Sequence, residues 1–345
     1  MTAATNLRQV PLLKRYLTFT WITLGLAAVL LLLSAFNSPS LLVNTLVSGG
    51  MWAMMAGGLA LVFGVMNIPN FAHGELFMIG SLVASLVYAP IRQLVLDNPT
   101  NTLLKWAGPF PGILVACLVG FGAGVLLEGT VFRQLRKRSR ESWMMNTFLL
   151  TAGVSVIMQN SDMLLFGNFP RGISRYWDFK PINILGVTLA VDRLMVFIIA
   201  MVVIAAFALF LQKTRTGRSM RAVSMDETGA QMAGISLNGV YRLTLGLSSA
   251  LAALAGASLL WLLPATPTVG QAPLLVAWYV VILAGLGNVQ GAIIGGFLVA
   301  MIQQFTAYYI SLDWVDVVPT AFIILVLLFK PSGLFGSEVK GVWEQ

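Results

Sequence analysis

Long apolar blocks separated by short polar segments constrain this chain more than any other feature. Only 10% of its 345 residues are charged, whereas a soluble domain of this length usually carries about 25%. Several blocks are long enough to cross the hydrocarbon core of a bilayer as a helix, which takes about 20 residues. The sequence therefore predicts an all-α membrane protein.

The blocks predict a polytopic helical bundle of about ten transmembrane helices (eight to ten), some of them broken or short, in one transmembrane domain over residues 1–345. The predicted spans are 16–36, 41–65, 71–91, 110–132, 143–166, 192–212, 242–263, 273–287, 289–310 and 316–330. The eighth and the tenth of these are the shortest. We expect no soluble domain between the spans.

Clusters of Lys and Arg between the apolar blocks predict the orientation of the chain. They precede the first span, follow the fourth, sixth and tenth spans, and comprise Arg8, Lys14, Arg15, Arg133, Arg136, Lys137, Arg138, Arg140, Lys213, Arg215, Arg218, Arg221 and Lys330. Ten spans place all four clusters on one side, which the positive-inside rule assigns to the cytoplasm. Both termini are therefore expected in the cytoplasm, and the net charge of +8 does not indicate nucleic-acid binding.

The most unusual polar segment surrounds Pro69. Proline has no backbone N–H, and the residue before it avoids the helical region, so we expect a helix to break here. Asn67 and Asn70 flank the proline, and His73, the only histidine of the chain, and Glu75 follow. One interpretation is a broken helix that lines a path across the bilayer, where ionisable groups face the bundle interior or water. The alternative is a tight cytoplasmic turn in which His73 and Glu75 are wetted or cap a helix.

Patterns for metal binding or catalysis are scarce. One histidine and one cysteine, Cys117, cannot build a His/Cys zinc site, and His73 with Glu75 lacks a third catalytic partner. The sequence also contains no G-x-x-x-x-G-K-[ST] phosphate loop. We therefore expect neither an enzyme nor an ATPase, and no cofactor or metal bound by this chain.

Four further acids lie near the ends of predicted spans: Glu128, Asp162, Asp313 and Asp316. We expect them to be solvated there. A proton-coupled secondary transporter would place acids in the middle of its spans, so their position argues against ion coupling without excluding that class.

The longest inner loop, residues 213–241, predicts a short helix on the cytoplasmic face. Ser224 and Glu227 have the spacing of a capping box, and Gly234 is a natural C-terminal stop. A helix over 225–233 would be too short to cross the bilayer and would lie on its surface.

Charged residues surround this short helix. Arg218 and Arg221 precede it, and Asp226 and Glu227 lie in its first turn. Such a helix suits the groove of a partner protein, and an ordinary surface helix is the alternative interpretation.

A weak internal repeat relates the two halves of the chain. A shift of 221 positions aligns Gly64, Asn67 and Gly74 with Gly285, Asn288 and Gly295. Each set lies where two apolar blocks meet. The agreement either arises by chance in a glycine-rich chain or indicates the same helix break in both halves, as in transporters built from repeats.

Three blocks of the sequence resemble one known family. They are residues 58–64 running into 70–75, residues 216–222 through 233–235, and residues 285–296 with 328–335. In this order they resemble the LivH-type permeases of branched-chain amino acid ABC transporters, within the hydrophobic amino acid uptake group, over residues 41–336. In place of the family's usual Val-Ile-Asn before Phe-Ala-His-Gly, this chain has Asn67-Ile-Pro-Asn70.

The resemblance implies an importer subunit in the bacterial cytoplasmic (inner) membrane. Its partners would be a LivM-type second permease, two ABC ATPase subunits that use the ATP, and a periplasmic or lipid-anchored substrate-binding protein. Urea and short-chain amide permeases of the same group remain an alternative, although they usually have Met where this chain has Phe71.

Residue roles follow from the segments that carry the resemblance. The candidates for the translocation path or gate are Asn67, Asn70, His73, Glu75 and Asn288. Residues 213–241 form the cytoplasmic coupling loop, and its candidates for ATPase contact are Arg218, Arg221, Asp226, Glu227 and Gly234.

Overall fold

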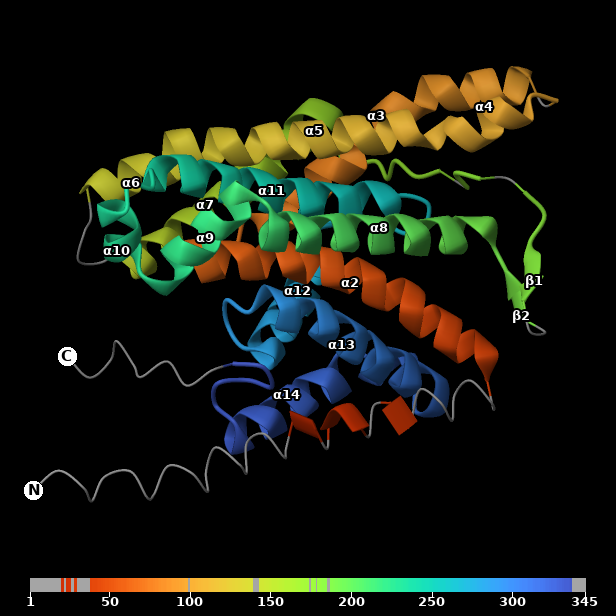
Figure 1. Ribbon diagram of the computed structural model, residues 1–345. Helices are drawn as coiled ribbons and strands as arrows, with labels where there is room; N and C mark the ends of the chain where they lie inside the picture. The colour runs from red at the N-terminus through yellow and green to blue at the C-terminus, as the bar shows by residue number, and fades with distance from the viewer. Residues whose placement is uncertain are drawn as a thin grey trace, which may run out of the picture.

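The fold was determined as a computed structural model of the chain (Figure 1). The structure describes residues 38–98, 100–138, 143–173, 175–177, 179–184 and 187–336, together with a few positions between 20 and 29. The predicted span 16–36 and the basic residues before it lie almost entirely outside the described residues.

The described residues are helical almost throughout, which confirms the predicted all-α class. The elements are α2 (Pro39–Met66), α3 (His73–Asp97), α4 (Thr102–Ala107), α5 (Pro109–Leu127), the π-helix η1 (Glu128–Phe132), α6 (Arg133–Arg138), α7 (Trp143–Phe166), β1 (Ile182–Ile184), β2 (Val187–Leu189), α8 (Val191–Lys213), α9 (Arg215–Met225), α10 (Glu227–Met232), α11 (Leu237–Ser258), α12 (Gln271–Ala284), α13 (Val289–Tyr309), the 3₁₀ turn η2 (Leu312–Trp314) and α14 (Val317–Phe329). Within these residues, eight helices are long and apolar enough to cross a membrane. The small antiparallel hairpin β1–β2, in which Ile182 pairs with Leu189, was not predicted.

Helix α12 corrects the predicted span 273–287. It has 14 residues and is therefore about 21 Å long, shorter than the hydrocarbon core of about 30 Å. The backbone of Gly270, just before α12, packs directly on that of Gly74 in the first turn of α3. Residues 259–270 therefore return into the bundle after α11. Helix α12 crosses the membrane only together with this segment.

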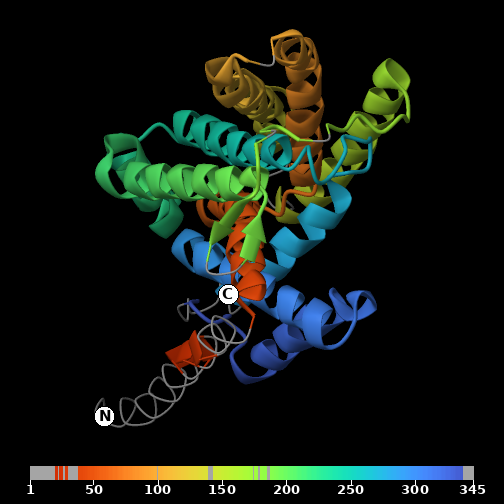
Figure 2. The same ribbon diagram turned by 90° about the vertical axis from the view of Figure 1, so that its right-hand side faces the viewer.

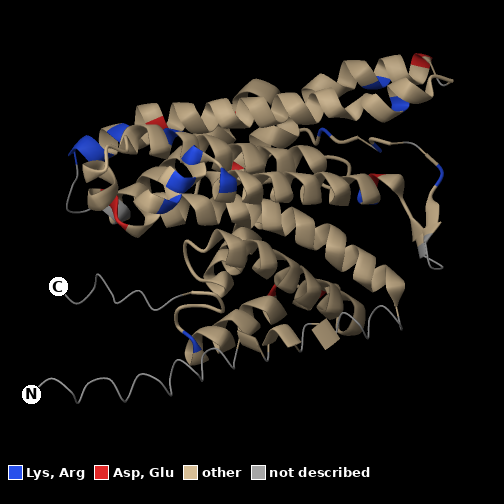
Figure 3. Cartoon of the chain, in the orientation of Figure 1, with Lys and Arg blue, Asp and Glu red and all other residues tan. Residues whose placement is uncertain are grey.

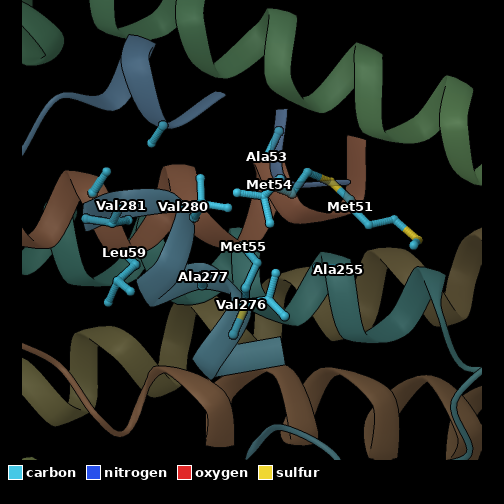
Figure 4. Packing of buried hydrophobic residues seen from close by; sticks show 14 of the residues in the cluster. Met51, Ala53, Met54, Met55, Leu59, Ala255, Val276, Ala277, Val280 and Val281 are labelled. Carbon is cyan, nitrogen blue, oxygen red and sulfur yellow. The ribbon is translucent and has the colours of Figure 1, made fainter. Parts of the chain in front are cut away.

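Helix α2 lies at the centre of the bundle and packs against α8, α11, α12 and α13 (Figure 1). Figure 4 shows part of the apolar core, with the labelled residues Met51, Ala53, Met54, Met55, Leu59, Ala255, Val276, Ala277, Val280 and Val281. Helix α13 can approach α2 closely because Gly296 has no side chain. A Cβ atom at that position would lie only 2.6 Å from the backbone nitrogen of Ala53. Such small-residue contacts provide the van der Waals packing that holds helices together in lipid.

Helix α7 stands at the edge of the bundle (Figure 2). Only 11% of its apolar window is buried, against 78% for α2. Its outer faces are therefore free for lipid or for another subunit.

The basic residues of α6, α9 and the end of α8 gather at one end of the bundle (Figure 3). The end of α2 and the starts of α7 and α11 lie at this same end (Figure 1). The common position of these charges agrees with the loop pattern of the sequence.

Candidate functional site

The predicted helix break at Pro69 is present. Helix α2 ends at Met66, Asn67 takes the left-handed conformation with φ of 51°, and α3 begins only at His73. Two of the freed N–H groups are satisfied by protein: Ala72 N donates to Asn70 Oδ1 at 3.1 Å, and Phe71 N donates to a hydroxyl oxygen of α7. A break with satisfied backbone groups is tolerated at membrane depth.

Two contacts of His73 show how deep the break reaches. His73 Nε2 lies 3.0 Å from the carbonyl oxygen of Met55, eleven residues before the end of α2. Its Nδ1 lies 3.4 Å from Ser248 Oγ, eleven residues after the start of α11. The end of α2 and the start of α11 lie on the same side, so each helix places His73 about 16 Å inside the bundle, near the middle of the bilayer core. His73 is fully buried, and the interpretation as a wetted cytoplasmic turn is therefore wrong.

The Glu75 carboxylate lies beside the middle of α7. Its Oε1 accepts hydrogen bonds from Gln159 Nε2 at 2.6 Å and from Ser155 Oγ at 2.8 Å. Its Oε2 has no hydrogen-bond partner among the described residues, although the side chain is only 1% exposed. Ser155, Gln159 and Asp162 occupy positions i, i+4 and i+7 and so share the face of α7 that turns toward α3.

Two acids that we expected at solvated span ends are buried instead. Asp162 is 7% exposed and Glu128 is 0% exposed, because α7 turns the first toward α3 and the turn from η1 into α6 covers the second. Asp313 and Asp316 are exposed as expected. Asp162 is therefore a second buried carboxylate on the face of α7 that carries Ser155 and Gln159, and its charge acts on Glu75.

Asn67 and Asn288 lie elsewhere, where the two helix breaks touch. A Cβ atom at Gly64 would lie 2.6 Å from the carbonyl oxygen of Gly287, so the ends of α2 and α12 meet through glycine backbone. Asn288 caps α13, since its Oδ1 accepts from Gly291 N at 2.8 Å. Asn67 is exposed. The five path candidates therefore divide into a deep group (Asn70, His73 and Glu75) and an inner-end group (Asn67 and Asn288).

The inner loop folds as two helices and corrects the single helix predicted over 225–233. Helices α9 and α10 meet at Asp226, whose backbone is extended. No capping box forms, because Ser224 Oγ donates to the carbonyl oxygen of Arg221 at 2.8 Å. The N-cap of α9 is Thr214 instead, whose Oγ1 accepts from Gly217 N. The predicted stop is correct, since Gly234 has φ of +82°, which only glycine adopts readily.

The α9–α10 corner is anchored on one side and open on the other. Met220, Val223 and Ala230 are buried in an apolar cluster with the ends of α2 and α8. On the open side Met225 is 88% and Met232 is 85% exposed. The same open side carries the predicted contact residues Arg218, Arg221, Asp226, Glu227 and Gly234, all of them exposed.

Comparison with known proteins decides the family. The sequence profile of the family described as "Branched-chain amino acid transport system / permease component" matches residues 41–327. The chain belongs to this family. The permease is 31% identical to the branched-chain amino acid permease BraD of Pseudomonas aeruginosa, over 87% of this chain and 97% of that protein.

Further relatives have related transport functions. Identity is 29% to LivH of Escherichia coli K12, over 87% of this chain and 96% of that protein. It is 28% to the ribose import permease RbsC of Escherichia coli K12, over 85% and 87%. No solved structure matches the permease.

A chain of polar contacts connects α10 of the permease to the π-helix η1. The Tyr241 hydroxyl on α11 interacts electrostatically with the Glu227 carboxylate. The Arg136 guanidinium lies over the Tyr241 ring at 4.5 Å from its centroid, and its Nη2 pairs with the buried carboxylate of Glu128. Two regions distant in sequence, residues 128–136 and 227–241, therefore meet beneath the inner corner.

Sequence reasoning missed Ser155, Gln159 and Tyr241, and it misplaced Asp162. The sequence did contain a signal for Ser155, Gln159 and Asp162. Polar residues at positions i, i+4 and i+7 mark one face of an otherwise apolar span. Nothing local identified Tyr241, whose position depends on how α11 packs against α6 and α10.

Proposed function

We propose that this chain is the membrane permease subunit of an ABC importer for branched-chain or other hydrophobic amino acids. Membership of the permease family and the names of the relatives BraD and LivH support this assignment. The chain forms half of the translocation path, and a LivM-type second permease forms the other half. A periplasmic or lipid-anchored binding protein delivers the substrate, and two separate ATPase subunits bind and hydrolyse the ATP.

The observation that carries the coupling role is the exposed α9–α10 corner. Its large exposed apolar side chains, Met225 and Met232, and its charged rim are typical of a docking surface. Its underside is packed into the same apolar cluster as the ends of α2 and α8. A movement of a docked ATPase is therefore transmitted through this corner to the transmembrane helices α2 and α8.

The deep group of Asn70, His73 and Glu75 is proposed to line the path. Helix breaks with buried polar groups near the bilayer midplane are where transporters commonly bind their cargo. Asn67 and Asn288 are proposed to act at the inner gate, where the two breaks touch. Alternating access then opens the deep group first to the outside and next to the cytoplasm.

The permease is proposed to lie in the bacterial cytoplasmic membrane with both termini in the cytoplasm. The basic residues of α6 and α9 share one end of the bundle, and the positive-inside rule assigns that end to the cytoplasm. This places the α9–α10 corner on the side where ATP is available.

The docking role is tested by replacing Asp226 and Gly234 together with alanine. We expect the variant to lose co-purification of the ATPase subunits and to lose amino acid uptake. The matched control replaces Asp313, an exposed acid that follows the outer end of α13, and Gly122, which has open space around it. Undiminished assembly and uptake in the Asp226/Gly234 variant would rule the docking role out.

A second experiment separates the importer from a secondary transporter. Membrane vesicles are depleted of ATP but kept energised by an ion gradient. The ABC importer takes up no amino acid under these conditions, whereas an ion-coupled carrier continues to do so.

A further inference from the structure

Two buried carboxylates lie between α3 and α7, and each has an oxygen without a hydrogen-bond partner in the part of the chain that the structure describes. We propose that Glu75 and Asp162 form the site on the translocation path that receives the α-ammonium group of an amino acid. This inference rests on the proposed function and names the chemistry by which the path recognises its cargo.

The hydrogen bonds of Glu75 leave room for one more donor. Ser155 and Gln159 both bind Oε1, while Oε2 is buried without a partner among the described residues. Asp162 Oδ1 is unpartnered in the same sense. Burying a carboxylate oxygen with no donor is costly. An ammonium group carries three N–H donors and a positive charge, and so it can supply the donor that each of these oxygens lacks.

Acidic side chains outnumber basic ones around the site. Glu75 and Asp162 interact with each other, and Arg171 interacts with Asp162. The two ring nitrogens of His73 face Met55 and Ser248 and not these carboxylates. Two acidic side chains against one guanidinium favour a cationic ligand over a neutral one at this site, which fits an ammonium group.

An apolar surface that could contact the side chain of the amino acid lies one helical turn closer to the inner end than Glu75. Phe71 stacks on Trp278 with centroids 5.3 Å apart and meets Phe148 edge-on at 4.9 Å. Its backbone N–H bonds to Thr151, one helical turn before Ser155 on α7. An aliphatic side chain laid against these rings would leave the ammonium group at Glu75.

The site also connects toward the outer end of the bundle. Gln159 Oε1 accepts from Gln271 Nε2 at 3.4 Å, and Gln271 is exposed. Arg171, which interacts with Asp162, lines a hollow of about 390 Å³ at the outer part of α3. Cargo arriving from outside would therefore meet Asp162 first and Glu75 next.

A site for an ammonium group would favour amino acids over neutral substrates. Urea, amides and sugars have no cationic group to pair with Glu75 and gain no ion pair there. An α-amino acid gains a charge-assisted hydrogen bond, which is stronger than one between neutral groups.

The test uses the complete transporter, reconstituted in liposomes with its ATPase subunits and with binding protein in saturating excess. Variants E75Q and D162N remove each charge but keep the side-chain size, and the amide oxygen introduced by E75Q can still accept from Ser155 and Gln159. D313N removes an exposed acid and serves as the control. L-leucine uptake, ATP hydrolysis and subunit co-purification are measured for each.

We expect E75Q to slow leucine uptake by about 10- to 100-fold, the usual effect of losing a hydrogen bond to a charged group. We expect D162N to slow it by about threefold or more, because Arg171 already offsets part of its charge. Assembly and ATP hydrolysis should persist in both variants, and D313N should behave as the wild type. Wild-type uptake by E75Q overturns the proposal.

If E75Q does not assemble, leucine uptake by the D162N variant tests the proposal. Selective loss of uptake with ATP hydrolysis intact supports the site, and unchanged uptake overturns it. Failure of the proposed function gives a different result: the wild-type transporter would then move urea or ribose but not leucine. If the wild type and the variants move leucine equally well, the ammonium site is rejected but the importer function is not.

Discussion

The buried ion pair between Glu128 and Arg136 gives the sharpest prediction about stability. Glu128 is fully buried, whereas the Arg136 side chain is 18% exposed. Arg136 also lies over the ring of Tyr241. The two partners therefore differ in what each would retain if the other were removed.

This asymmetry sets the expected magnitudes. Arg136→Met leaves the Glu128 carboxylate buried without its cation and should destabilise the fold by about 3–5 kcal/mol. Glu128→Gln leaves Arg136 with an amide oxygen, an aromatic face and some water, and should cost about 1–2 kcal/mol. The double variant buries no unpaired charge, so it should be more stable than Arg136→Met alone.

Thermal unfolding in detergent measures these differences. The only cysteine, Cys117 on α5, is partly buried, so a thiol-reactive fluorophore reports when α5 is released. With an unfolding entropy of about 0.7 kcal/mol/K for a chain of this length, Arg136→Met should lower the midpoint by about 4–7 °C. Lys137→Met removes an exposed charge from the same helix and should change it by less than about 1 °C.

Two results would refute this reasoning. Equal losses for Glu128→Gln and Arg136→Met would mean that the difference in burial has no energetic consequence. A double variant less stable than Arg136→Met would mean that the carboxylate is held by groups other than Arg136.

Three further predictions follow from the helix breaks and the inner corner. Gly64→Val should abolish monodisperse protein in size-exclusion chromatography because its side chain would enter the opposite break, whereas Gly122→Val, in open space, should not. Asn288→Ala should lower the unfolding midpoint by the loss of a cap worth about 1 kcal/mol, and Asn288→Asp should restore most of it. Exchanging Met225 and Met232 for serine should weaken ATPase co-purification about tenfold or more without moving the midpoint; an unchanged complex would contradict the docking surface.

Much of the fold was predictable because its causes are local or concern the solvent. The apolar blocks require helices in lipid wherever they lie, since no water is there to satisfy the backbone. Pro69 breaks a helix through its own missing N–H and its effect on the preceding residue. Gly234 ends α10 because the left-handed conformation is available to glycine itself. These features need no knowledge of distant neighbours.

The depth of the site depended on packing between distant segments. His73 could equally have lain at the membrane surface until the contacts with Met55 and Ser248 placed it near the middle of the bundle. Asp162 is near a span end in sequence, yet α7 turns it toward Glu75. Which helix faces which, and at what height, is a property of the assembled bundle, because the apolar pattern of a helix specifies a face but not the partner or the axial register.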